Sequence, residues 1–188
     1  MSRRFYVCSY GGSGSRMLQK YLSNFGKAYH VHSRNPPLMP QKSDEISEFF
    51  DGRSEDMRNS QVIFIFKDPI QAIASRFWIP EHPAHIQCKD PNVTIQDAID
   101  KQEDVWGIHE FFNNYVIKNK NRTYPIYCVN YHKFFNNIIK FNQVLKIRNV
   151  PSTFPIKQET QREYINELIP VYSNLIERIH NMPIIQVV

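Results

Sequence analysis

The chain concentrates glycine in one short turn. Of its six glycines, three stand within four residues, as Gly11, Gly12 and Gly14. Residues 4–9 before the turn have the composition of a strand, and apolar residues after it recur at helical spacing up to Gly26. A turn of this kind presents free backbone N–H groups at the positive end of a helix dipole. The pattern predicts a binding site for a phosphate or a sulfate group.

The same turn could be only a tight strand-to-helix connection, and the glycines alone leave that alternative open. It matches neither of the two common nucleotide-binding patterns. Arg16 is its only cation, so the turn lacks the lysine of GxxxxGK[ST], and Met17 occupies the third glycine position of GxGxxG. A nucleotide kinase and a dinucleotide-dependent enzyme are therefore less favoured interpretations.

A second candidate segment follows the clearest strand of the sequence. Residues 61–66 are apolar on both faces, which is typical of a central strand in a parallel sheet. Lys67-Asp68-Pro69 ends this strand, and residues 70–78 read as a helix with a proline near its first turn. Lys67 is thus predicted to lie at the carboxyl edge of the sheet, where open α/β sheets bind ligands.

The remaining elements alternate between strands and helices. Further strands are predicted at residues 28–32 and 125–130, and helices at residues 94–119, 133–147 and 159–180, the last bent at Pro170. This alternation favours an α/β fold of three layers (α/β/α) around a mostly parallel central sheet. With 188 residues, the chain is expected to form one domain, residues 1–188.

Charge and cysteine content narrow the class of protein. The chain has 23 Lys and Arg against 18 Asp and Glu, and its net charge of +5 attracts anions of any kind. Its three cysteines are far apart, which argues against a disulfide framework and a thiolate zinc site. His82, His85 and Cys88 lack a fourth ligand at the usual spacing, so no metal site is predicted. Because the apolar runs are short and the N-terminus lacks a signal-peptide core, we expect a cytoplasmic chain without a membrane span.

Three segments resemble motifs of the sulfotransferase family. Residues 10–18 (YGGSGSRML) are similar to the family's 5′-phosphosulfate loop, YPKSGTTWL or PRSGTT. Residues 62–69 (VIFIFKDP), with Ser75 in the next helix, resemble the 3′-phosphate segment, a strand that ends in RNP or RDP. Residues 128–134 (CVNYHKF) resemble the strand-end segment YEDL. The resemblance covers most of the chain from residue 5 to about residue 135.

This resemblance implies a P-loop NTPase-like sulfotransferase architecture, with 3′-phosphoadenosine 5′-phosphosulfate (PAPS) as co-substrate and no metal. The sulfuryl group would pass to a hydroxyl or amine of a small molecule, a glycan or a peptide, and no nucleic-acid partner is expected. Lys67 and Ser75 would hold the 3′-phosphate, and Tyr131 would stack on adenine. The residues implied to bind the nucleotide are Gly11, Gly12, Ser13, Gly14, Ser15, Arg16, Lys67, Ser75 and Tyr131.

The chain departs from the family pattern at two positions. Gly12 stands where the loop usually carries a Lys or Arg that assists the leaving group, so Arg16 is the candidate catalytic cation. Lys67 replaces the usual arginine, which exchanges a bidentate fork for a point charge. The first departure leaves open a protein that binds the nucleotide without catalysing transfer. A P-loop kinase is a third interpretation.

For the general base, the resemblance favours His32, which ends the strand at residues 28–32 in the position of the family's KTH histidine. A histidine with a pKa of about 6.5 can accept a proton at neutral pH. His30 lies on the same strand face, in the position of the family's lysine. Both could instead be ordinary surface histidines, and Glu45 or Glu48 is the alternative base.

Overall fold

A single mostly parallel sheet organises the chain. The computed structural model describes residues 3–31, 33–36, 60–77, 92–122, 124–148 and 163–188. Within these ranges the sheet has the strand order β2-β1-β3-β4-β5. Its strands are β1 (Arg4–Cys8), β2 (Lys27–Val31), β3 (Ser60–Phe66), β4 (Ile126–Asn130) and β5 (Ile185–Val187). The first four pair in parallel and β5 is antiparallel to β4, so the expected α/β class with a mostly parallel sheet is confirmed.

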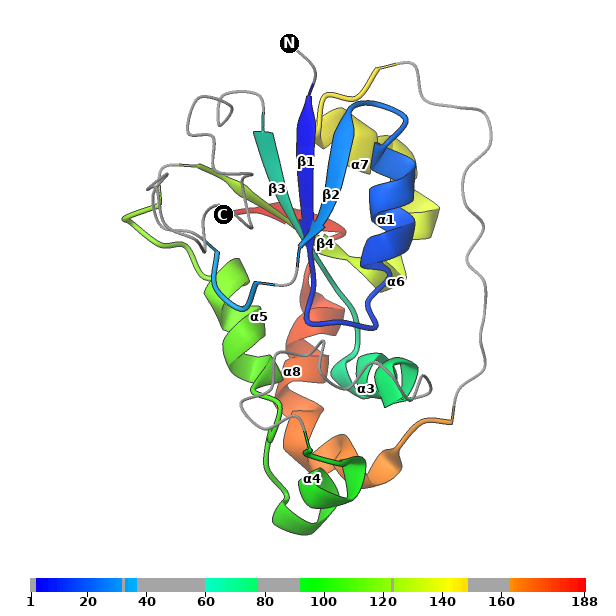
Figure 1. Ribbon diagram of the computed structural model, residues 1–188, viewed down its shortest axis with the longest axis vertical. Coiled ribbons are helices and arrows are strands. Elements are labelled where there is room, and N and C mark those ends of the chain that lie inside the picture. Colours follow the sequence, from blue (N-terminus) through cyan, green and yellow to red (C-terminus); the bar gives the residue numbers. More distant parts are fainter. Residues whose placement is uncertain (1–2, 32, 37–59, 78–91, 123, 149–162) are drawn as a thin grey trace.

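Helices cover both faces of this sheet (Figure 1). Alternate residues of one strand face opposite sides, so Phe64 packs into one hydrophobic cluster while Ile63 and Ile65 pack into the other. The face that holds Phe64 is covered by α3 (Pro69–Phe77), α5 (Ile108–Val116) and α8 (Ile169–Asn181). The opposite face is covered by α1 (Ser15–Leu22), α6 (Tyr131–Phe134) and α7 (Ile138–Val144).

The predicted helix over residues 94–119 is wrong, because two helices occupy that range. Helix α4 (Ile95–Lys101) ends at Gln102, whose φ of 53° is left-handed, and α5 begins after Gly107, whose φ is 62°. Between them, the Asp104 carboxylate accepts the N–H groups of Ile108 and His109 and the hydroxyl of Tyr172 in α8. The break between α4 and α5 is therefore stabilised by a contact with α8, which is distant in the sequence.

The C-terminal third also differs from the expectation. Pro170 lies at the start of α8, where proline is tolerated, so it does not bend a longer helix. The helix predicted over 133–147 is divided into α6, a 3₁₀ turn at Phe135–Asn137 and α7. The antiparallel strand β5 was not predicted, because three residues carry too little pattern to reveal a strand.

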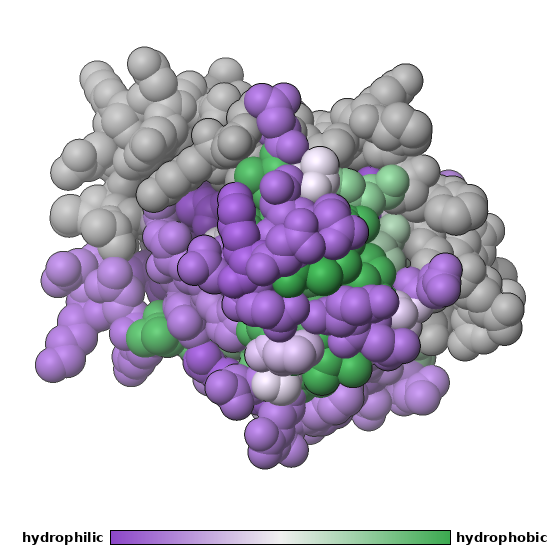
Figure 2. Space-filling model, turned by 90° about the horizontal axis from the view of Figure 1, so that it is seen from below, coloured by the Kyte–Doolittle hydropathy of each residue, from purple (hydrophilic) through white to green (hydrophobic). Residues whose placement is uncertain are grey.

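The surface at the carboxyl end of the sheet is mainly hydrophilic, with hydrophobic side chains visible in its middle (Figure 2). Among the described residues, none of the helices combines the length and the hydropathy that crossing a membrane requires.

We predict that Phe64→Ala lowers the free energy of unfolding by about 3–5 kcal/mol, the range for truncating a buried aromatic ring. The Phe64 ring is fully buried and stacks on Tyr115 with centroids 4.5 Å apart. Urea unfolding followed by circular dichroism measures the change. Ile139→Ala is the control, since this side chain is 72% exposed and its truncation should change stability by less than about 0.5 kcal/mol. Equal effects of the two substitutions would contradict the packing described here.

Candidate functional site

The glycine turn connects β1 to α1 at the carboxyl edge of the sheet (Figure 1). Gly11, Gly12 and Gly14 have φ values of 90°, 61° and 82°. L-residues with a side chain rarely adopt these left-handed conformations, so the glycines are required by the path of the backbone. The first amide N–H groups of α1 lack acceptors within the helix and lie directly after this turn. The arrangement has the elements of an anion site.

Each of the three glycines also has a neighbour that leaves no room for a side chain. A Cβ on Gly12 would overlap the carbonyl oxygen of Ala72 in α3. A Cβ on Gly11 would lie 2.7 Å from Nε of Arg76, and one on Gly14 would lie 2.5 Å from Cε2 of Tyr131. The turn is therefore enclosed by α3 on one side and by the Tyr131 ring on another.

Buried hydroxyl groups tie the turn to its neighbours. The Ser15 Oγ lies 2.8 Å from Nε2 of His30 on β2 and accepts a hydrogen bond from Ser9 Oγ at 3.1 Å. Ser9 Oγ in turn accepts the amide N–H of Gly11 at 3.1 Å. Ser13 is fully buried, and its Oγ donates to the Gly11 carbonyl. His30 thus sets the geometry of the turn through Ser15.

The second predicted segment lies beside the first. Lys67 follows β3, is 8% exposed, and donates from Nζ to the Ser75 Oγ at 2.9 Å. Its Nζ also lies 5.6 Å from the centre of the Tyr131 ring. The buried Tyr10 hydroxyl accepts the Lys67 N–H and donates to the Lys67 carbonyl, which joins the turn to the end of β3. The structure therefore brings Lys67, Ser75 and Tyr131 together next to the turn.

Positive charge gathers around the turn. The pKa of the Arg76 guanidinium is lowered to about 10, first by burial and then by the charge of Arg16. The pKa of His30 is also lowered, by burial and then by the charges of Arg16 and Arg76. Arg16 itself is exposed on the first turn of α1. Because burial and the charge of Arg16 both destabilise the Arg76 cation, the site favours a negatively charged ligand.

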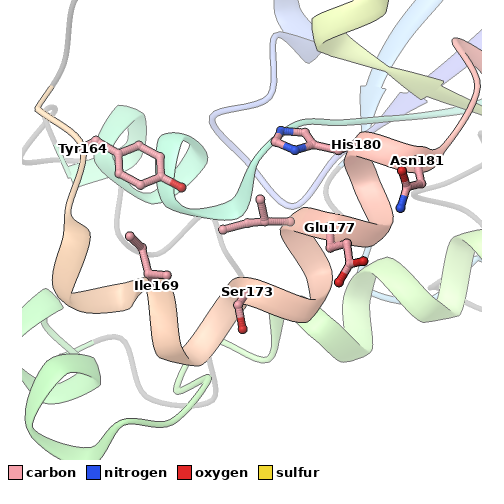
Figure 3. Close-up of a pocket in the computed structure, with 7 residues that line it drawn as sticks. Tyr164, Ile169, Ser173, Glu177, His180 and Asn181 are labelled. Carbon is pink, nitrogen blue, oxygen red and sulfur yellow. The ribbon is translucent and has the colours of Figure 1, made fainter.

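Next to Lys67, Asp68 forms hydrogen bonds with three neighbouring residues. The Asp68 carboxylate accepts the N–H of Gln71 and the hydroxyl of Tyr164, and the Asp68 N–H donates to Nε2 of His132. Tyr164 and His180 also line a pocket along α8, shown in Figure 3, and the His180 ring lies 6.4 Å from that of His132. In this view the Tyr164 hydroxyl points toward the middle of the pocket.

Several predicted residues lie outside the described part of the chain. These are His32, Glu45, Glu48, His82, His85 and Cys88. Among the residues that are described, no group of three His, Cys, Asp or Glu side chains could hold a metal ion. Cys8 and Cys128 are buried free thiols, and burial raises their pKa values to about 11 and about 12.

Sequence reasoning missed Arg76 as a neighbour of the turn. The available signal was its place in α3, one helical turn after Ala72 and directly after Ser75. That spacing puts Ala72 and Arg76 on one face of the helix, but only the folded chain shows that this face meets the turn.

The chain matches no protein-family model, no curated protein and no solved structure. The interpretation of the site therefore depends on its own geometry and charge.

We predict that Gly12→Ala destabilises the protein by at least about 1–2 kcal/mol, the cost of a side chain in a left-handed conformation. The overlap with the Ala72 carbonyl adds to this cost, because either the turn or α3 must shift. Chemical denaturation measures the effect, with Lys20→Ala on the exposed side of α1 as control. Unchanged stability of Gly12→Ala would contradict the close approach of the turn and α3.

The lowered pKa of His30 predicts a pH dependence of stability. In the unfolded chain a histidine has a pKa of about 6.5, so as the pH falls below that value the unfolded state binds the proton first. Stability that is present above about pH 6.5 is therefore lost as the pH falls toward the lower folded-state pKa. Thermal unfolding from pH 8 to pH 5 should show a smaller loss of Tm for His30→Gln than for the natural protein. Parallel curves for the two proteins would rule out this contribution of His30.

Proposed function

We propose that this chain binds PAPS at the glycine turn and transfers its sulfuryl group to an acceptor hydroxyl or amine, with a P-loop NTPase-like sulfotransferase architecture. The observation that carries the proposal is the contact between Lys67 Nζ and Ser75 Oγ, 2.9 Å apart beside the turn. A buried ammonium group and a hydroxyl offer donors to a phosphate oxygen. A second phosphate-binding position next to the turn fits a nucleotide that carries a 3′-phosphate in addition to its 5′ group.

The turn supports the other end of the same ligand. Its left-handed glycines and the first amides of α1 fit the anionic 5′-phosphosulfate, and the neighbouring cations add attraction. Tyr131, which is half-buried and lies next to both Gly14 and Lys67, is the proposed stacking partner for adenine.

The chemistry conserves atoms and charge. The acceptor oxygen or nitrogen attacks the sulfur in line with the bond to the bridging oxygen of the 5′-phosphate. The new S–O or S–N bond forms as the bond from sulfur to the bridging oxygen breaks, and the electron pair of the broken bond stays on the bridging oxygen. The products are adenosine 3′,5′-bisphosphate and a sulfate ester or a sulfamate, and the acceptor proton passes to a base. His32 is the proposed base and lies outside the described residues.

In this proposal the protein accelerates transfer by positioning the partners and by stabilising the charge that develops on the leaving phosphate. Both effects are typical of phosphoryl-transfer sites, whose transition states are similarly loose. His30 contributes by holding Ser15 in place through their 2.8 Å hydrogen bond. Burial and then the charges of Arg16 and Arg76 lower the pKa of His30, which favours the neutral ring in this contact.

Calorimetric titration with adenosine 3′,5′-bisphosphate tests the proposal, with ADP and ATP as controls. Selective binding of the bisphosphate is the expected result, since only this ligand places a phosphate at the sugar 3′ position. Equal or tighter binding of ATP would favour a kinase. Binding of none of the three would refute the proposed nucleotide site.

We predict that Lys67→Met weakens binding of adenosine 3′,5′-bisphosphate by about 1.5–3 kcal/mol, the value of a hydrogen bond to a charged group. The reason is that Lys67 would donate to the 3′-phosphate. Binding of adenosine 5′-monophosphate, which lacks this phosphate, should stay unchanged. Lys140→Met, which removes an exposed lysine of α7, is the matched control. Equal losses for both nucleotides would place Lys67 outside the 3′-phosphate position.

A further inference from the structure

The guanidinium of Arg76 lies against the glycine turn. A Cβ built on Gly11 would be 2.7 Å from Nε and 2.9 Å from Cζ of Arg76, so the guanidinium occupies the space where a side chain would otherwise stand. The Nε and Nη2 atoms are buried, and neither has a hydrogen-bond partner in the described part of the chain. Among the described residues, no carboxylate forms an ion pair with Arg76.

An arginine in this state is costly for the free protein. Buried guanidinium groups normally bind a carboxylate or a carbonyl, because donors removed from water need acceptors. Burial lowers the pKa of the Arg76 guanidinium, and the nearby positive charge of Arg16 lowers it further. A half-buried guanidinium with two buried, unsatisfied nitrogen atoms at a candidate anion site has the properties expected of a ligand-binding residue.

The packing of α3 explains why the cation comes from this helix. The Ala72 carbonyl lies where a side chain at position 12 would begin, so the turn itself cannot carry a lysine or an arginine there. Arg76 follows Ala72 by one helical turn and therefore projects from the same face of α3. The contact that excludes a cation from the turn thus brings a different cation to its edge.

We propose that Arg76 binds the 5′-phosphate end of the nucleotide and is the cation that stabilises the leaving phosphate, in place of a side chain at position 12. This inference rests on the proposed function, since it assigns a residue to the same nucleotide site. The bound phosphate oxygens would accept hydrogen bonds from the Nε and Nη2 atoms of the guanidinium. Arg76 and the Lys67–Ser75 pair would then hold the 5′ and 3′ ends of one ligand.

The test compares two nucleotides that each carry one phosphate with adenosine 3′,5′-bisphosphate. In calorimetric titrations, Arg76→Gln should weaken the binding of the bisphosphate and of adenosine 5′-monophosphate by about tenfold to hundredfold, as expected for loss of a hydrogen bond to a charged group. Adenosine 3′-monophosphate should bind Arg76→Gln and the natural protein equally. Arg76→Lys should restore only part of the affinity, because an ammonium cannot form the bidentate contact. Lys20→Gln, an exposed change of equal charge on α1, should leave all three affinities unchanged.

A second measurement separates ligand binding from a structural role. Without ligand, Arg76→Gln should raise Tm, because it removes a half-buried cation whose Nε and Nη2 atoms have no partner among the described residues and which Arg16 repels. A lower Tm together with an equal loss of affinity for all three nucleotides would overturn the assignment, since Arg76 would then support the fold.

The outcomes also distinguish the two proposals. If the natural protein binds the bisphosphate but Arg76→Gln binds it equally well, Arg76 is not the cation at the 5′ end and the nucleotide site stands. If the natural protein binds no bisphosphate, the proposed function fails, and with it the assignment of Arg76.

Discussion

The contact between the glycine turn and helix α3 is the constraint on which the rest of the site depends. The Gly12 backbone lies so close to the Ala72 carbonyl that the turn and the helix cannot move independently. Tyr10 reinforces this joint from the other side, through hydrogen bonds to both backbone groups of Lys67. Because α3 follows β3 directly, the same joint sets the positions of Lys67 and Ser75 relative to the turn.

The core beneath the site makes this joint rigid. Both β1 and β3 are buried in the centre of the sheet, and the fully buried Phe64 ring lies among Tyr10, Phe111 and Tyr115. A ring cluster of this kind leaves few alternative packings, because interiors are close-packed and side chains occupy defined rotamers. The strand ends that carry the site are therefore held at fixed separations, which is the condition for preorganised binding of an anion.

Charge is distributed unevenly around the joint. Burial and then the charges of Arg16 and Arg76 lower the pKa of His30. The Asp68 carboxylate accepts hydrogen bonds from the Gln71 N–H and the Tyr164 hydroxyl. The positive groups thus face the turn without a carboxylate that neutralises Arg76 within the described residues. Such an arrangement costs stability in the free protein, and a bound anion of the kind proposed would recover it, which would link stability to ligand occupancy.

The strands β1 to β4, the turn and α3 could be predicted from the sequence, because an apolar run or a cluster of glycines is a local pattern that reflects local geometry. Tertiary structure alone decided the break between α4 and α5, where Asp104 caps α5 and also accepts a hydrogen bond from Tyr172, 68 residues away. It also decided that Arg76, 65 positions from Gly11, meets the turn, and that His30 reaches Ser15. These contacts join segments distant in the chain, so their energies depend on how the layers pack, which no local pattern encodes.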